Sequence, residues 1–179
     1  MHIFLGNVED FDLAQIKLFG TLINGESIPT LGEALETVID STRLNVVWLD
    51  IKDPSIVANV VSIQHNAIDK ARASGRDSLK IYLGVPDKNI LDSYSNCPDK
   101  TTDILIEFSR EEASQNSNCK VWAPRWTNGI PSSLPGKEIF VWTLDVQGFI
   151  SEFMKSDNVN GILTNYPSLV SGMYFSGNH

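Results

Sequence analysis

The sequence predicts an α/β domain in which a parallel β-sheet is covered by helices and curls toward a barrel. Short, nearly continuous apolar runs alternate with helical patterns along the chain, which is typical of parallel strands buried on both faces. Chemically distinctive residues stand at the ends of several of these runs, which favours a barrel over an open sheet with a single switch point. The sequence also contains no glycine-rich phosphate loop of the Rossmann or P-loop type. We therefore expect one domain spanning residues 1–179.

The expected strands are short apolar runs, near residues 45–51, 79–84, 103–108, 120–123 and 139–144, with a further short one at 161–164. Before the first of them, Thr30 and Glu33 have the spacing of a capping box, and the apolar residues that follow recur at the period of a helix. Pro54 opens a second helix, which closes near Gly75.

Helical signals also follow the later strands. Pro86 is expected to start a short helix that runs through Leu91. Ser109 precedes a helix with acidic residues in its first turn, where the helix dipole favours them. The segment 127–136 is rich in Gly, Pro and Ser and is expected to be a loop. A helix over about 147–155 comes before the last short strand.

Composition excludes two classes of function. The chain carries a formal net charge of −8 and no run of basic residues, which argues against nucleic-acid binding. No apolar stretch reaches the roughly eighteen residues that a membrane helix needs. The N-terminal residues lack the basic region of a signal peptide, and the compartment is not predicted.

The cysteines and histidines do not form a metal-binding pattern. Cys97 and Cys119 lie in polar, loop-like surroundings without CxxC spacing. We expect two free thiols, with a single disulfide as the alternative. His65 falls in a helical pattern, and His2 and His179 are terminal, so all three are expected to be solvated.

Charged residues stand at the end of the strand near 45–51. Because side chains alternate along a strand, Asp50 and Lys52 point to the same face, together with Val46 and Trp48. The C-terminal ends of strands are where ligands bind in α/β sheets and barrels. A salt bridge that only caps the strand is the alternative, and the residues alone do not decide between the two.

Glu107 stands near the C-terminal end of the strand at 103–108 and could face the same surface. A solvated strand-end charge is the simpler interpretation of this residue. Trp122, Arg125 and Trp126 lie in and just after the next strand and form either a pocket wall or a packed loop, of which we favour the packed loop.

Several segments, in this order, resemble the glycerophosphodiester phosphodiesterase family. They are GESIPTLGEAL (25–35), NVVWLDIK (45–52), VWTLD (141–145) and GILTNYP (161–167). The family has G-x-x-I-P-T-L-E-E-A-L before a barrel helix, an apolar strand ending in E-x-K, and W-T-V-N followed by G-I-I-T-D-x-P. The matches cover most of the chain, and their common order makes the resemblance specific.

The resemblance implies a TIM barrel, and the departures from it bear on activity. Family members carry H-R-G, E-x-D and H-D motifs in their N-terminal third, which supply the acid and base histidines and two of three metal-binding carboxylates. None of these motifs occurs in this sequence, so the first three strands are expected to be lacking. Asp50 replaces the family's Glu, Asp145 its Asn, and Asn165 its Asp.

The family's chemistry implies roles for four residues. Asp50 would be a ligand of a divalent cation, Ca²⁺ or Mg²⁺, bound weakly and with many waters because one carboxylate offers few oxygen ligands. Lys52 would be catalytic, contacting a phosphate oxygen as a point charge. Trp142 would pack an apolar part of the substrate at the rim, with a core aromatic as the alternative. Glu107 would bind substrate by its position only.

Three functions remain open from the sequence. The first is a glycerophosphodiester phosphodiesterase-like hydrolase, which would produce glycerol 3-phosphate and an alcohol from a small-molecule glycerophosphodiester in lipid metabolism. The second is a truncated or noncatalytic relative that acts as a binding or interaction domain. The third is an unrelated small-molecule-binding α/β domain. A TIM barrel has eight strands in typically about 250 residues, so this chain is also expected to leave sheet edges, which a homo-oligomer could cover.

Overall fold

The structure is a computed structural model that describes residues 8–20, 25–100 and 103–176. Its described part contains one sheet whose strands are β1 (Val46–Leu49), β2 (Lys80–Val85), β3 (Ile104–Ile106), β4 (Cys119–Trp122), β5 (Glu138–Val141) and β6 (Gly161–Ile162). Every pairing in this sheet is parallel, and the strand order equals the chain order. The predicted parallel sheet is therefore confirmed, including the pairing of the first two strands.

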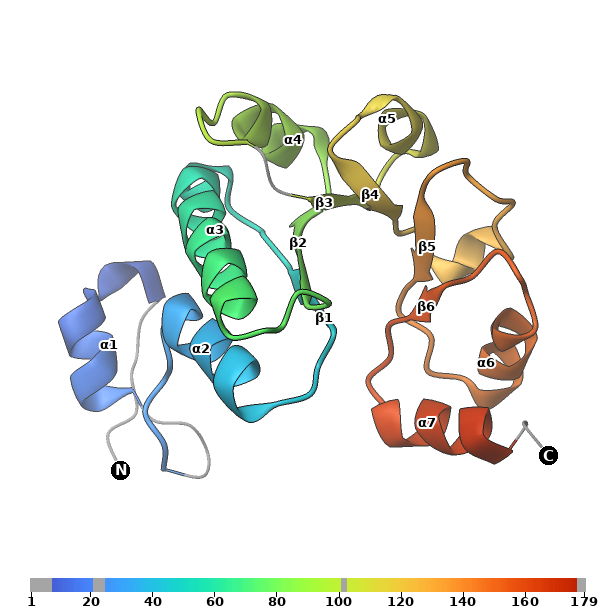
Figure 1. Ribbon diagram of the computed structural model, residues 1–179, viewed down its shortest axis with the longest axis horizontal. Coiled ribbons are helices and arrows are strands. Elements are labelled where there is room, and N and C mark those ends of the chain that lie inside the picture. The colour runs from blue at the N-terminus through green and yellow to red at the C-terminus, as the bar shows by residue number, and fades with distance from the viewer. Residues whose placement is uncertain (1–7, 21–24, 101–102, 177–179) are drawn as a thin grey trace.

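The helices alternate with these strands and are α1 (Leu13–Phe19), α2 (Leu31–Ser41), α3 (Val57–Ala73), α4 (Lys88–Ser95), α5 (Arg110–Gln115), α6 (Gln147–Met154) and α7 (Pro167–Ser176). In Figure 1 the strands follow one another in an arc, with α3, α4, α5 and α6 along its outer side. The arc is open between β1 and β6, the two edge strands. This is a partial, TIM-barrel-like α/β fold, as predicted.

Local sequence signals explain most helix ends. The Thr30 hydroxyl and the Glu33 carboxylate form the predicted capping box at the start of α2. The prediction for α4 was wrong at both ends, because the Asp87 carboxylate caps the helix by accepting from the Ile90 amide. The helix therefore begins at Lys88, and it continues past Leu91 so that Tyr94 is buried against the core.

The two faces of the sheet bury different side chains, because successive residues of a strand point to opposite faces. On the outer face, residues such as Ile81, Leu83 and Val85 pack in the main core, which also takes in residues of the helices. The inner face holds a smaller cluster made of Tyr82, Leu105, Val121 and Ala123, with Trp48, Phe140 and Trp142 packed against it. The concave side of the sheet is thus lined with aromatic and aliphatic side chains.

Both cysteines are free, as predicted, but their surroundings were predicted wrongly. Cys97 and Cys119 are buried, and Cys119 begins β4 instead of lying in a loop. Burial raises the pKa of both thiols above the usual value. His65 lies partly buried on α3, whereas His2 and His179 fall outside the described residues.

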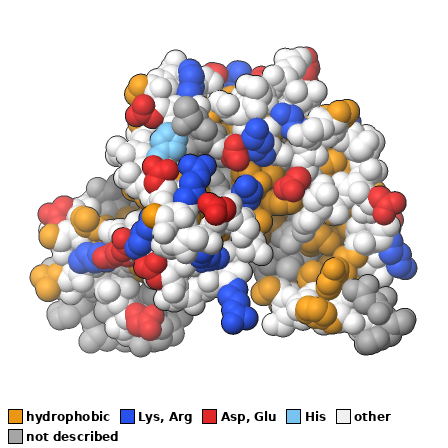
Figure 2. Space-filling model, viewed as in Figure 1, with side chains coloured by type: hydrophobic (Ala, Val, Ile, Leu, Met, Phe, Trp, Pro, Cys, Tyr) orange, Lys and Arg blue, Asp and Glu red, His pale blue; other side chains and the backbone are white. Residues whose placement is uncertain are grey.

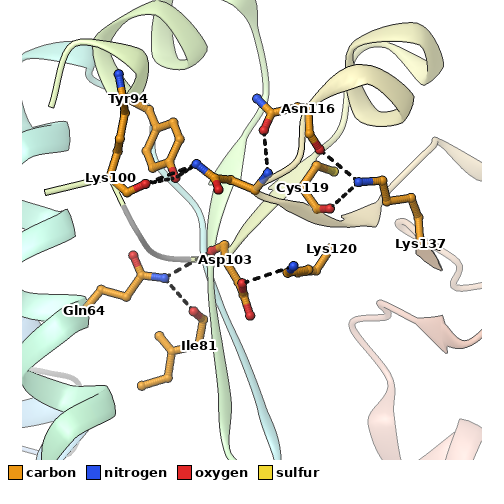
Figure 3. Close-up of polar contacts among 10 residues, drawn as sticks. Gln64, Ile81, Tyr94, Lys100, Asp103, Asn116, Cys119, Lys120 and Lys137 are labelled. Atoms are coloured by element: carbon orange, nitrogen blue, oxygen red, sulfur yellow. Dashed lines mark hydrogen bonds and ion pairs between the residues drawn. The ribbon is translucent and has the colours of Figure 1, made fainter.

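Polar contacts tie the N-terminal ends of the strands together (Figure 3). The fully buried Gln64 of α3 donates from Nε2 to the carbonyl oxygens of Ile81 at 2.6 Å and Asp103 at 3.3 Å. Lys137, just before β5, donates from Nζ to the carbonyl oxygens of Asn116 at 2.9 Å and Cys119 at 2.6 Å. In barrels this end of the strands serves stability, so the opposite end is where a site is expected.

None of the helices in the described part of the chain combines the length and the hydrophobicity of a membrane span. The single-domain organisation and the homo-oligomer that would cover the edges of β1 and β6 stay predictions.

Candidate functional site

Five side chains gather at the C-terminal ends of the strands, toward the inner face. They are Asp50, Lys52, Glu107, Arg125 and Trp142, which we call the mouth. Three of them were predicted to lie together, namely Asp50, Lys52 and Trp142. Figure 2 shows hydrophobic side chains in the hollow over the strands, with charged side chains of both signs around it.

Asp50 and Lys52 follow β1 and form an ion pair. Lys52 Nζ lies 2.6 Å from Asp50 Oδ1, and the two side chains are 71% and 58% exposed. The hydrogen bond to Asp50 raises the pKa of Lys52 above its usual value. An exposed pair of this kind contributes at most about 1 kcal/mol to stability, so capping the strand is a weak reason for its presence.

Glu107 follows β3 and is the most perturbed acid of the mouth. The simpler interpretation, a solvated strand-end charge, is wrong, because Oε1 is buried and has no hydrogen-bond partner. Burial, followed by repulsion from Asp50, raises the pKa of Glu107 to about 7, against the opposing effects of Lys52 and Arg125. A carboxyl group with this pKa exchanges its proton near neutral pH.

Trp142 and Arg125 form the other side of the mouth. The Arg125 guanidinium lies 4.6 Å from the centre of the Trp142 ring, in a cation–π contact. Trp142 Nε1 donates to the Ala123 carbonyl oxygen at 2.6 Å, which fixes the plane of the indole. Trp142 is partly exposed at the edge of the inner cluster, so it combines the rim and core positions that were predicted as alternatives.

Arg125 is the member of the mouth for which the sequence reasoning favoured a packed loop over a pocket wall. Its neighbours do pack as predicted, since Trp122 lies under Arg110 and Trp126 lies against Phe149. Val121 and Ala123 belong to the inner cluster, and continuing the same alternation past the end of β4 would have placed Arg125 on that face.

Asp145 and Asn165 show why two departures from the family pattern are compatible with the fold. The Asp145 carboxylate accepts from the backbone amide and the side-chain Nδ2 of Asn165, both at 2.8 Å, and from Thr164 Oγ1 at 2.9 Å. The backbone hydrogen bond from Asn165 lowers the pKa of Asp145. The acid and the amide have exchanged places relative to the family pattern, and in this chain they bind each other.

The mouth does not contain a preformed set of ligands for a divalent cation. Within the described ranges, no group of three or more His, Cys, Asp or Glu side chains could hold a metal ion. Asp50 is already paired with Lys52, which leaves the buried Glu107 oxygen as the other carboxylate donor. Ca²⁺ takes six to eight oxygen ligands, so these residues alone do not fit a tightly bound cation.

Solved structures show where else this fold occurs. A protein assigned as a glycerophosphoryl diester phosphodiesterase from Silicibacter pomeroyi DSS-3 superposes with a TM-score of 0.58 and 18% identity, over 86% of this chain and 58% of that one. A glycerophosphodiester phosphodiesterase from Parabacteroides distasonis ATCC 8503 superposes with a TM-score of 0.66 and 16% identity, over 94% of this chain and 72% of that one. No protein-family profile and no curated protein matches the sequence.

At these identities the likeness establishes the fold alone. It agrees with the barrel-derived fold that the sequence resemblance implied. This chain spans less than two thirds of the length of the first of these proteins.

Proposed function

We propose that this protein is a glycerophosphodiester phosphodiesterase-like hydrolase that binds its substrate at the mouth. The reaction is the hydrolysis of a glycerophosphodiester to glycerol 3-phosphate and an alcohol, a step of lipid and glycerol metabolism. The observation that carries the proposal is the gathering of Asp50, Lys52, Glu107, Arg125 and Trp142 at the C-terminal ends of the strands. In barrel enzymes this end holds the active site.

Each side chain of the mouth suits one part of such a substrate. Lys52 and Arg125 are cations that would bind the phosphoryl oxygens, where charge develops during phosphodiester cleavage. The partly exposed face of Trp142 would pack against an apolar part of the substrate. Asp50 and Glu107 are the oxygen donors that Ca²⁺ or Mg²⁺ would use, with waters and substrate oxygens completing a weak site.

A second candidate function is binding without turnover. Two observations favour it. The described residues offer too few donors for a metal ion. His65 is the one histidine among the described residues, and it lies on the outer helix α3, away from the mouth. General acid–base groups each contribute roughly 10²–10⁴-fold to a rate. If this second candidate is correct, the chain by itself shows little or no hydrolysis of glycerophosphocholine.

Calorimetric titration with glycerophosphocholine tests the binding step that both candidates share. The Lys52→Met variant is expected to bind about 10–100-fold more weakly, because a charge-assisted hydrogen bond is worth roughly 1.5–3 kcal/mol. Lys120→Met is the matched control. Lys120 Nζ also lies near an aspartate, 4.0 Å from Asp103 Oδ1, but at the N-terminal end of the strands (Figure 3). Equal affinities of the two variants would contradict the site.

Release of choline, measured with and without Ca²⁺ or Mg²⁺, separates the two candidates. Metal-dependent hydrolysis that Asp50→Ala abolishes would establish the enzyme and remove the second candidate. Binding without hydrolysis under all these conditions would leave the second candidate as the function of the chain.

A further inference from the structure

We infer that the C-terminal ends of the strands dock onto a zwitterionic lipid surface, through exposed apolar side chains that surround the mouth. These side chains are Ile56, Phe108, Val146, Phe149 and Tyr166, which we call the apolar ring. The inference deepens the proposed function and rests on it in one respect, which is that the mouth binds a phosphodiester. Docking itself requires no hydrolysis.

The apolar ring lies at one end of the sheet because each of its members follows a strand. Ile56 comes after β1, Phe108 after β3, and Tyr166 after β6, whereas Val146 and Phe149 stand at the start of α6, after β5. In a barrel-like parallel sheet these segments meet at the C-terminal ends of the strands, which is the end that holds the mouth. The exposed fractions of the five side chains run from 40% to 57%.

The opposite end of the sheet has a different surface. The connections that enter β2, β3, β4 and β6 are rich in Ser, Asn, Asp and Lys, and none of their described residues is an exposed large hydrophobic side chain. Leu79, just before β2, is buried. The exception is β1, at the open edge of the sheet, where Leu44 and Val46 are exposed. The concentration of exposed apolar side chains around the mouth is therefore not shared by the other end.

Val146 stands where a polar side chain is usual. It is the N-cap of α6, a position at which Ser, Thr, Asp or Asn accepts a hydrogen bond from a free backbone amide, and it makes no such bond. The helices α4 and α5 do have polar caps, Asp87 and Ser109. A valine that is 53% exposed at a cap position costs stability in water, and transfer of its side chain into an apolar medium is favourable.

Phe149 connects the apolar ring to the mouth. Its ring centroid lies 4.8 Å from that of Trp126. The Trp126 amide donates to the carbonyl oxygen of Trp142, a member of the mouth, at 3.0 Å. Tyr and Trp side chains favour the headgroup region of a lipid layer, because one end of each is apolar and the other is polar. Trp126 and Tyr166 are of this kind.

The arrangement fits a lipid surface better than a protein partner. The members of the apolar ring stand on separate connections around an opening, so a protein seated on all of them would cover the mouth. A lipid surface contacts the same side chains and presents phosphodiester headgroups to Lys52 and Arg125 at the centre. Charge then selects the kind of lipid. The chain has a formal net charge of −8, which disfavours an anionic surface and leaves a zwitterionic one.

The test is flotation of the full chain with phosphatidylcholine vesicles at neutral pH. The unmodified protein is expected to float with the vesicles. Tyr166→Ser should lower the partition coefficient about 3–10-fold, and the double variant Val146→Ser/Tyr166→Ser about 10–100-fold, because less apolar surface leaves water on docking. Circular dichroism checks that each variant is folded.

Tyr174→Ser is the matched control. Tyr174 is 58% exposed, close to the 57% of Tyr166, but it lies near the C-terminal end of α7, away from the mouth. Its replacement should leave the partition coefficient unchanged. An equal loss in Tyr166→Ser and Tyr174→Ser would overturn the inference. So would absence of flotation of the unmodified protein, or stronger binding to vesicles that contain phosphatidylglycerol.

Two further measurements cover the alternatives. Sedimentation velocity tests for a second copy on the apolar ring, and self-association that Tyr166→Ser abolishes would overturn docking onto lipid. Calorimetric titration with glycerophosphocholine separates the inference from the proposed function, because Tyr166→Ser should bind this ligand as the unmodified protein does. Absence of vesicle binding with intact glycerophosphocholine binding overturns the inference alone. Vesicle binding without glycerophosphocholine binding overturns the proposed function.

Discussion

Gly84 of β2 is a position where the inner face accepts no side chain. A Cβ atom there would lie 2.8 Å from the Leu49 carbonyl oxygen and 2.9 Å from Trp48 Cδ1, with Trp48 Nε1 closer still. Ordinary contacts begin at 3.4 Å, so the neighbours would have to move by 0.5 Å or more. Gly84→Ala is therefore expected to destabilise the protein by about 1–3 kcal/mol, the usual cost of overpacking a core.

Urea unfolding followed by circular dichroism measures this cost, and the midpoint of thermal unfolding should fall by roughly 2–4 °C for each kcal/mol in a chain of this size. Gly172→Ala is the matched control. Gly172 lies inside α7 with nothing within 4 Å of an added Cβ, so alanine should stabilise the helix by up to about 1 kcal/mol.

The double variant Trp48→Leu/Gly84→Ala tests whether the Trp48 indole causes the clash. Two of the three close contacts are with the indole, so Gly84→Ala should cost less when Trp48 is leucine, by about 0.5–3 kcal/mol of coupling. The reasoning is refuted if Gly84→Ala changes stability by less than about 0.5 kcal/mol, or if it costs the same in both backgrounds.

Two further predictions concern stability. Folding raises the pKa of Glu107 from an ordinary 4.5 to about 7, so between these pH values the folded protein holds a proton that the unfolded chain has lost. The free energy of unfolding should therefore fall as pH rises from 4.5 to 7. Glu107→Gln should flatten this slope in urea unfolding measured across that range. Gln64→Leu removes two hydrogen bonds to buried strand carbonyl oxygens and should cost about 1–3 kcal/mol, measured by the same unfolding; a neutral result would mean that water replaces the amide.

The strands were predictable because their apolar runs are nearly continuous and local. The start of α2 was predictable from a local signal too, because Thr30 and Glu33 form a capping box that can be recognised in the sequence. In contrast, α7 was not predicted, because Gly172 and several polar residues interrupt its apolar pattern; Leu169, Val170 and Met173 pack against the core only once the tertiary fold exists.

The mouth was predictable in part for a related reason. Period-two alternation placed Asp50 and Lys52 together without knowledge of the rest of the fold. Glu107 was expected to be solvated, because its burial depends on the curvature of the sheet and on Asp50 and Arg125 from other strands. No single-segment pattern encodes that arrangement.

Because each strand of the described sheet pairs only with its neighbours in sequence, the fold behaves as a linear array of strand–helix units. Such arrays add stability unit by unit, and their ends open before their middle. The central strands β2, β3 and β4 should then exchange their amide protons last, and β1 and β6 first. Asp50 and Lys52 stand on an end unit, whereas Glu107 stands near the centre, so the two sides of the mouth differ in how readily they open.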